Sequence, residues 1–273
     1  MESLDVKSLT AIVAGVLGLL GLAVVSGAGG GVRGPRGKGL FVRSTAHAGT
    51  PAALISFCQD LGVSWVMLPV IWQYVTKSDV RYDADIDAYA SALKKAGIRV
   101  WVWGWPEPAK VAGFADLMLE TRARIGADGI VVNAEKPFYG EPAAASELAS
   151  RLAGVSWGLS SYGAPYFHKS FPWAEFAATT SLGMPQIYDT QHNLGADYPQ
   201  KSVDAWRALG FSQIAPTWGA SSAHTPAQML DIAARTLDQG GIMAASWWDF
   251  YHLKQSAGRR DAVRSVQVPR LVA

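Results

Sequence analysis

Cysteine is almost missing from this sequence of 273 residues, and its histidines are few. Cys58 is the single cysteine, which excludes an intramolecular disulfide and a cysteine-based zinc site. Because Cys58 lies in a helix-like segment, we expect it to be buried rather than reactive. The five histidines show no ligand-like spacing, although His47 lies near the end of the first expected strand. The sequence therefore predicts no metal site and no cofactor.

Charge and serine-based catalytic patterns are also scarce. Charged residues make up 17% of the chain, and the formal net charge is only +2. Lys and Arg are scattered, without a stripe of alternating basic and aromatic residues, so nucleic acid is excluded as a partner. The one G-x-S-x-G match, at residues 154–158, lies where an expected strand begins, so it does not indicate the serine nucleophile elbow, which follows a strand. Hydrophobic residues, at 49%, are numerous enough to build a sizeable core.

The first 26 residues are predicted to be a separate hydrophobic segment. Residues 9–25 form an apolar run without a charge, short for a membrane span but able to contact a lipid bilayer. An uncleaved anchor, a cleaved signal and a packed internal helix are the alternatives, and the anchor is favoured. Gly15, Gly18 and Gly21 would form a face for helix–helix association. A membrane-anchored or exported location, in a cell envelope or virion membrane, is expected, with the orientation open.

Residues 27–38 are predicted to be a Gly- and Arg-rich linker, and residues 39–273 one (β/α)8 barrel. Eight apolar, strand-like runs alternate with amphipathic, helix-like segments, as in parallel α/β folds. The rival is an open doubly wound sheet, but no Gly-rich phosphate turn follows the first strand. The runs are expected to begin at Gly39, Ser64, Arg99, Gly129, Ser156, Leu182, Phe211 and Gly241.

Helix ends are marked by two kinds of residue. Thr50-Pro51 and Thr225-Pro226 are typical of a helix N-cap followed by proline in the first turn. Glycines are expected to end helices in the left-handed conformation. They stand at positions Gly62, Gly97, Gly126, Gly154, Gly210 and Gly240.

Acids and aromatic residues follow the expected strands, where active sites of such barrels form. Carboxylates could protonate a leaving group, and flat rings could stack on sugars. The candidate residues, in strand order, are Trp72; Trp105 and Glu107; Asn133 and Glu135; Tyr162; Gln186, Tyr188 and Asp189; Trp218; and Trp247, Trp248 and Asp249.

The fourth strand is the most informative of these. In "DGIVVNAE", Val131, Asn133 and Glu135 alternate and should face one side. If that side is the barrel interior, Glu135 projects into the mouth above Asn133. A carboxyl group beside apolar walls stays protonated near neutral pH and can act as a general acid. The simpler alternative is a Glu135 paired with a neighbouring cation such as Lys136.

This strand resembles the D-G-x-D-x-D-x-E motif of glycoside hydrolase family 18, the chitinase-like barrels. Asp128, Gly129 and Glu135 match it in register. The run "MPQIYD" is similar to the family's M-x-Y-D strand, with Gln186, Tyr188 and Asp189 in register, and "GIMAASWWDF" to its eighth strand. The resemblance implies hydrolysis of a chitin-type glycan or peptidoglycan, with Glu135 as acid and Trp247 flooring the sugar subsite.

Two positions depart from the motif. Val131 and Asn133 replace the two aspartates, and the second of these orients the substrate's acetamido group in the family. Another carboxylate could assist, in which case Glu107 is nearest in the expected strand order, followed by Asp189 and Asp249. The two alternatives are a peptidoglycan muramidase of the family 25 type, which usually needs an Asp where this chain has 43–47, and an inactive barrel that binds glycans or is structural in a membrane or virion.

Overall fold

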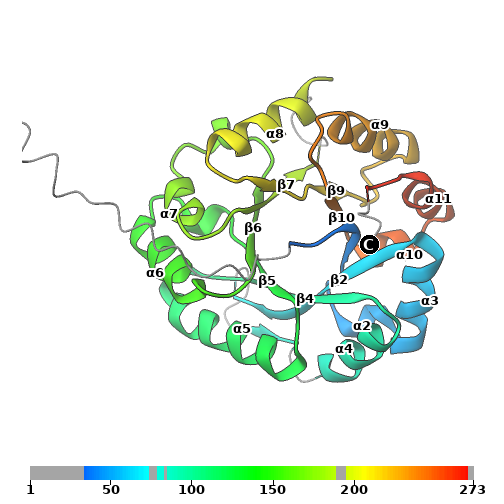
Figure 1. Cartoon of the computed structure of the whole chain (residues 1–273), viewed down its shortest axis with the longest axis horizontal. Helices are drawn as coiled ribbons and strands as arrows, with labels where there is room; N and C mark the ends of the chain where they lie inside the picture. Colours follow the sequence, from blue (N-terminus) through cyan, green and yellow to red (C-terminus); the bar gives the residue numbers. More distant parts are fainter. Residues whose placement is uncertain (1–33, 74–78, 83–84, 189–194, 270–273) are drawn as a thin grey trace, which may run out of the picture. The chain divides into compact units, whose positions relative to one another are not determined.

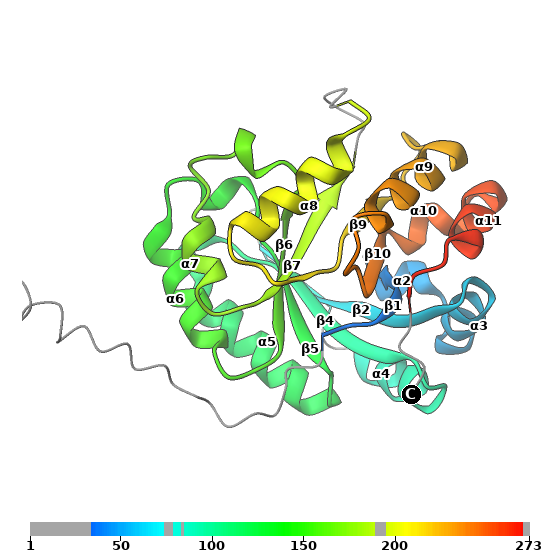
Figure 2. The same cartoon turned by 45° about the horizontal axis from the view of Figure 1, so that its top comes forward.

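A computed structural model describes residues 34–73, 79–82, 85–188 and 195–269. Figure 1 shows a ring of strands surrounded by helices, viewed down the axis of the ring, and Figure 2 shows the same barrel tilted. The strands are β1 (Gly37–Phe41), β2 (Val63–Trp72), β3 (Val80–Arg81), β4 (Arg99–Trp105), β5 (Gly129–Asn133), β6 (Trp157–Tyr162), β7 (Leu182–Ile187), β8 (Gln213–Ile214), β9 (Thr217–Gly219) and β10 (Ala244–Trp248).

Helices lie between successive strands. The α-helices are α2 (Thr45–Ala48), α3 (Pro51–Leu61), α4 (Ile86–Lys95), α5 (Val111–Ile125), α6 (Pro142–Leu152), α7 (Trp173–Ala177), α8 (Tyr198–Ala208), α9 (Pro226–Leu237), α10 (Phe250–Lys254) and α11 (Ala257–Ser265). Short 3-10 helices are η1 (Pro108–Lys110), η2 (Lys136–Phe138) and η3 (Pro165–Phe167).

The sheet closes on itself. β1 pairs in parallel with both β2 and β10, and the remaining barrel strands follow in the order β4, β5, β6, β7 and β9. β8 and β9 are two pieces of the seventh barrel strand, because both pair with β7 on either side of Ala215 and Pro216. β3 is an antiparallel addition to β2. The prediction of a single (β/α)8 barrel is confirmed.

The predicted helix boundaries are found as well. Thr50 and Thr225 each accept a hydrogen bond from the backbone N–H three residues on, and a proline follows each. Thr225 forms a full capping box with Gln228. The six glycines expected to end helices all have positive φ. Local sequence thus determines where most of these helices begin and end.

The start of the barrel was predicted slightly too late. β1 begins at Gly37, and Lys38 is a buried strand residue with 6% exposure, so the linker does not extend to residue 38. The predicted anchor, with Gly15, Gly18 and Gly21, lies outside the described residues. Among the described residues, none of the helices is both long and apolar enough to cross a membrane.

Two hydrophobic clusters divide the core. One fills the barrel interior and includes Trp65, Trp101, Trp103, Val131 and Met184. The other, larger cluster lies between the outer face of the strands and the helices. Cys58 is buried in that outer cluster, as expected, and burial raises the pKa of its thiol to about 12. Because strand residues alternate between the two clusters, each side chain at a strand end has a defined direction.

Candidate functional site

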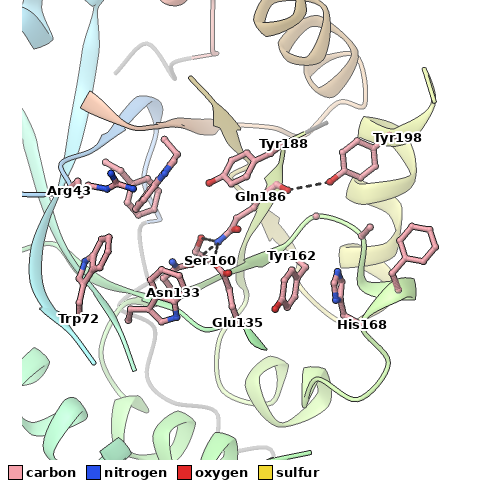
Figure 3. A pocket seen from close by; sticks show the side chains of 16 residues that line it. Arg43, Trp72, Asn133, Glu135, Ser160, Tyr162, His168, Gln186, Tyr188 and Tyr198 are labelled. Carbon is pink, nitrogen blue, oxygen red and sulfur yellow. Dashed lines mark hydrogen bonds between the residues drawn. The ribbon is translucent and has the colours of Figure 1, made fainter. Parts of the chain in front are cut away.

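A cavity of about 870 Å³ opens at the C-terminal ends of the barrel strands. Figure 3 shows its side chains converging from several strands. The described residues that line it are Phe41, Arg43, Trp72, Trp105, Asn133, Glu135, Ser160, Tyr162, Gly163, Ala164, Phe167, His168, Gln186, Tyr188, Tyr198 and Trp248.

Glu135 reaches this cavity from the end of β5, as the alternation predicted. Val131 belongs to the barrel interior, and Asn133 and Glu135 continue the same face upward into the cavity lining. The Gln186 amide on β7 donates to Asn133 Oδ1 at 2.7 Å and to Glu135 Oε1 at 3.0 Å. Gln186, two strands away from β5 in the barrel, therefore holds the Glu135 carboxyl group in one position.

Burial raises the pKa of Glu135 above its ordinary value of 4.5. Hydrogen bonds from Gln186 and Asn133 favour the carboxylate and oppose this effect, but burial outweighs them. No described cation forms an ion pair with Glu135, so the alternative of a simple pair with Lys136 is not what the structure shows. The carboxyl group is thus adapted to hold a proton at higher pH than a free glutamate.

Tyr188 and Tyr162 lie beside this acid. Burial raises the pKa of the Tyr188 hydroxyl well above its ordinary value, and the charges of Glu135 and Asp249 add to the shift. The pKa of Tyr162 is also raised, mainly by burial and then by its hydrogen bond with Tyr139. Both hydroxyl groups therefore remain protonated at neutral pH and can donate hydrogen bonds in the cavity.

An aromatic cluster forms the wall next to Tyr162. Its ring stacks on His168 with centroids 3.7 Å apart, and the Tyr139 hydroxyl is hydrogen-bonded to His168 Nδ1. Phe167, on the same loop, is 62% exposed and lines the cavity. The loop after β6 was not among the predicted sites, because its residues lie several positions beyond the strand end and belong to no recognisable motif.

Arg43 was also missed as a cavity residue. Its guanidinium carbon lies 5.7 Å from the ring centroids of both Trp72 and Trp248. Its Nε is 3.4 Å from Oδ2 of Asp249, which is fully buried. Its position in the sequence was a signal. Arg43 lies two residues after Phe41, an interior residue that ends β1, and so faces the mouth of the barrel.

Several predicted site residues do not line the cavity. Trp218 and Trp247 are each 1% exposed and pack against one another in the outer cluster, with Trp218 Nε1 donating to Thr236 Oγ1 on α9. The expectation that Trp247 floors the sugar subsite is therefore corrected. Trp248 faces the cavity instead, because it shares the inward side of β10 with Ala244.

Two of the assisting carboxylates predicted from strand order, Glu107 and Asp249, do not line the cavity. Glu107 has a side chain that is 43% exposed, and it pairs with Lys110 at 3.4 Å. Asp249 lies beneath the surface, where its Oδ1 accepts hydrogen bonds from the His252 backbone N–H and faces Nδ1 of that ring. Asp189 lies outside the described residues. Within the described ranges, no group of three or more His, Cys, Asp or Glu side chains is arranged to hold a metal ion.

Comparison of the sequence with protein-family models and with curated proteins gives no match. Solved structures do match. A class V chitinase from Pseudomonas fluorescens Pf-5 is 12% identical with a TM-score of 0.63, over 85% of this chain and 99% of that one. A family GH18 chitinase from the fern Peteris ryukyuensis is 10% identical with a TM-score of 0.59, over 83% and 96%. The fold is that of the family 18 chitinases and chitinase-like proteins.

The barrel also resembles a protein described as a pseudo-chitinase. Human YKL-39, a pseudo-chitinase with retained chitooligosaccharide-binding properties, is 10% identical with a TM-score of 0.58, over 84% of this chain and 99% of that chain. Identities of this size establish the shared fold alone. The chemistry of this chain depends on the residues of its own cavity.

Proposed function

We propose that the chain is a glycoside hydrolase of the family 18 type, which cleaves a glycan containing N-acetylhexosamine with Glu135 as general acid. One observation carries the proposal: Glu135 is the only carboxyl group among the described residues that line the cavity, and its pKa is raised. Most glycosidases need two carboxyl groups at the scissile bond, whereas an N-acetylated substrate can supply its own nucleophile. A single acid among the described lining residues thus favours such a substrate.

The first step uses the proton of Glu135. The acid protonates the glycosidic oxygen while the acetamido oxygen of the substrate forms a bond to C1, and the bond from C1 to the leaving oxygen breaks. Tyr188, whose hydroxyl remains protonated, donates a hydrogen bond to the acetamido group and orients it. Asn133 cannot supply the negative charge of the aspartate found at this position in family 18.

The second step returns the proton. The Glu135 carboxylate takes a proton from a water molecule as the water oxygen attacks C1 and opens the cyclic intermediate. The hydrogen bonds from Gln186 and Asn133 stabilise the carboxylate during this step. Trp105 and Tyr162, both in the cavity wall, provide flat rings for the apolar faces of the sugars.

Hydrolysis of N-acetylglucosamine oligosaccharides and of purified peptidoglycan by the full chain tests this proposal. Glu135→Gln is expected to lower the rate by about 10²- to 10⁴-fold, because the general acid is lost and the shape of the side chain is kept. Glu107→Gln is the matched control and should retain the rate, since that side chain is exposed and lies outside the cavity lining. A hydrolysis rate that Glu135→Gln leaves intact would refute the proposal.

Glycan binding without hydrolysis is the second candidate function. It is favoured by Val131, which is buried in the barrel interior. Family 18 has at this position the first of the two aspartates that precede the catalytic glutamate. If this function is right, oligosaccharides bind but are not cleaved, binding survives Glu135→Gln, and Trp248→Ala weakens it. Trp247→Ala is a matched control for the binding site, because that ring faces the helices instead of the cavity.

A further inference from the structure

Arg43 is a fixed cation in the wall of the cavity. Its guanidinium lies over the rings of Trp72 and Trp248, at 5.7 Å from each centroid, and its side chain is 36% exposed. Figure 3 shows it with Trp72 on the side of the view opposite Tyr162 and His168. Two aromatic faces hold the group in one orientation, which reduces the entropy lost when it binds a ligand.

Pairing with Asp249 does not use the whole guanidinium. The ion pair is made by Nε, at 3.4 Å from Asp249 Oδ2, while the other oxygen of Asp249 faces His252. Nη1 and Nη2 make no hydrogen bond to any described residue, so their four N–H donors are available on the cavity side. Such a pair of nitrogens matches the two oxygens of a carboxylate.

The charge of the cavity supports the same conclusion. Arg43 and Glu135 are the only described lining residues that are Arg, Lys, Asp or Glu, and burial favours the neutral form of Glu135. Among these described residues the permanent charge is therefore the Arg43 guanidinium, whose counter-ion Asp249 is buried beneath the lining. A neutral oligosaccharide gains little from a guanidinium, whereas an acidic sugar gains a charge-assisted, bidentate hydrogen bond.

We infer that the glycan bound in this cavity carries a carboxylate on one of its sugars, and that Arg43 is the residue that recognises it. This inference rests on the proposed function for the nature of the glycan, but not on cleavage. A lactyl ether on N-acetylhexosamine, as in the glycan strands of peptidoglycan, has the required chemistry. Sulfate and phosphate esters share the anionic character, and the experiment separates them from the carboxylate.

Calorimetry on the full chain with Glu135→Gln provides the test, because that variant binds without cleaving. The probes are a peptide-free tetrasaccharide of N-acetylglucosamine and N-acetylmuramic acid, the same tetrasaccharide with its carboxyl groups reduced to alcohols, a 6-sulfated N-acetylglucosamine tetrasaccharide and the neutral N-acetylglucosamine tetrasaccharide. The acid form should bind about tenfold or more tightly than the alcohol form, as expected for a charge-assisted bidentate contact.

Adding Arg43→Gln should abolish this preference while changing affinity for the neutral tetrasaccharide by less than about threefold, because only the carboxylate contact is lost. Arg43→Lys, which keeps the charge but not the paired donors, should retain part of the preference. The neutral tetrasaccharide also shows that each variant is folded. Equal binding of acid and alcohol forms, a preference that survives Arg43→Gln, or an Arg43-dependent preference for the sulfated probe alone would overturn the inference.

The two proposals fail separately. If the parent chain cleaves none of the glycans but the acid form still binds tightly through Arg43, the hydrolase proposal fails and the inference about the carboxylate stands. If the neutral tetrasaccharide is cleaved and the acid form is not preferred, the inference fails and the hydrolase proposal stands.

Discussion

At the scale of single residues, the direction of a side chain decides whether a tryptophan packs or binds. Trp247 and Trp248 are adjacent on β10, yet the first packs against Trp218 under the helices and the second lines the cavity. Both faces of a barrel strand are buried, so the run around them is apolar on either side. Sequence alone therefore gave no basis for choosing between the two rings, and the choice of Trp247 was wrong.

The raised pKa of Glu135 leads to a prediction about activity. Because the reaction needs the protonated acid, kcat/KM should fall as pH rises through the pKa of Glu135 in the folded chain. The midpoint of this fall should lie at a pH above 4.5, the ordinary pKa of a glutamate, because burial raises the pKa of Glu135. A pH profile of hydrolysis measures it, and a midpoint at or below the ordinary value would contradict the assigned role.

The same shift predicts how stability depends on pH. Burial disfavours the carboxylate, so the unfavourable contribution of Glu135 is absent below its pKa in the unfolded chain and complete above its pKa in the folded chain. Glu135→Gln removes that contribution. Relative to the parent, the variant should gain unfolding free energy as pH rises from about 4, near the pKa of an unfolded glutamate, through the raised pKa of Glu135 in the folded chain. Urea denaturation across this pH range measures the gain. A constant difference would show that the carboxyl group is not disfavoured by burial.

At the scale of the element, small residues make room for large ones inside the barrel. An added Cβ on Gly129 of β5 would lie 2.5 Å from the Trp101 ring, and one on Gly39 of β1 would lie 2.2 Å from Trp65.

A register shift between Pro69 and Ile71 changes the direction of the side chains that follow it on β2. Trp65 and Met67, two residues apart, point into the barrel interior, whereas Trp72 faces the cavity. Such a bulge re-aims the side chain that follows it.

Gly129→Ala should therefore destabilise the chain by about 1–3 kcal/mol, because the new methyl group overlaps a ring that other interior side chains hold in place. Gly113→Ala is the control. Gly113 is exposed in α5 with open space around its Cα, so alanine there should stabilise the chain by about 0.5–1 kcal/mol. Urea denaturation measures both, and a loss of stability in the control as large as in Gly129→Ala would dismiss the packing explanation.

At the scale of the whole molecule, one buried lysine joins the two ends of the barrel. Lys38 Nζ, on β1, donates to the Leu61 carbonyl at the end of α3 and to the Val263 and Arg264 carbonyls of α11. The first strand and the last helix, 225 residues apart in sequence, are thus connected through one ammonium group. Three carbonyl acceptors offset the cost of burying its charge.

Lys38→Met should lower the free energy of unfolding by about 1–3 kcal/mol or more, because it leaves buried carbonyl groups without a donor. Lys201→Met is a suitable control. Lys201, on α8, is 58% exposed and pairs with Asp197, the residue before that helix, so its loss should change stability little. Chemical denaturation of both variants checks this. An equal change in the free energy of unfolding for the two variants would show that the hydrogen bonds of Lys38 do not stabilise the barrel.

Much of the fold could be predicted because it is encoded locally. The eight alternating runs, the threonine caps and the glycine helix ends all act over a few residues. The caps and helix ends were found where expected, and the strands begin at or near the expected positions. Glu135 was also predictable, since β5 alternates without a bulge from Val131 upward. Where a strand keeps its register, side chains alternate between its two faces, so a residue at the mouth points to the same side as the interior residues two and four positions before it.

The remainder of the site depended on contacts between distant parts of the chain. Nothing near Arg43 in sequence indicates that Trp72 and Trp248 enclose it, nor that Gln186 connects Asn133 to Glu135. The sequence by itself determined the barrel, its helix boundaries and the position of the acid, because periodicity and capping are local. The tertiary structure decided which rings and charges meet that acid, because closing the sheet is what brings the strand ends together.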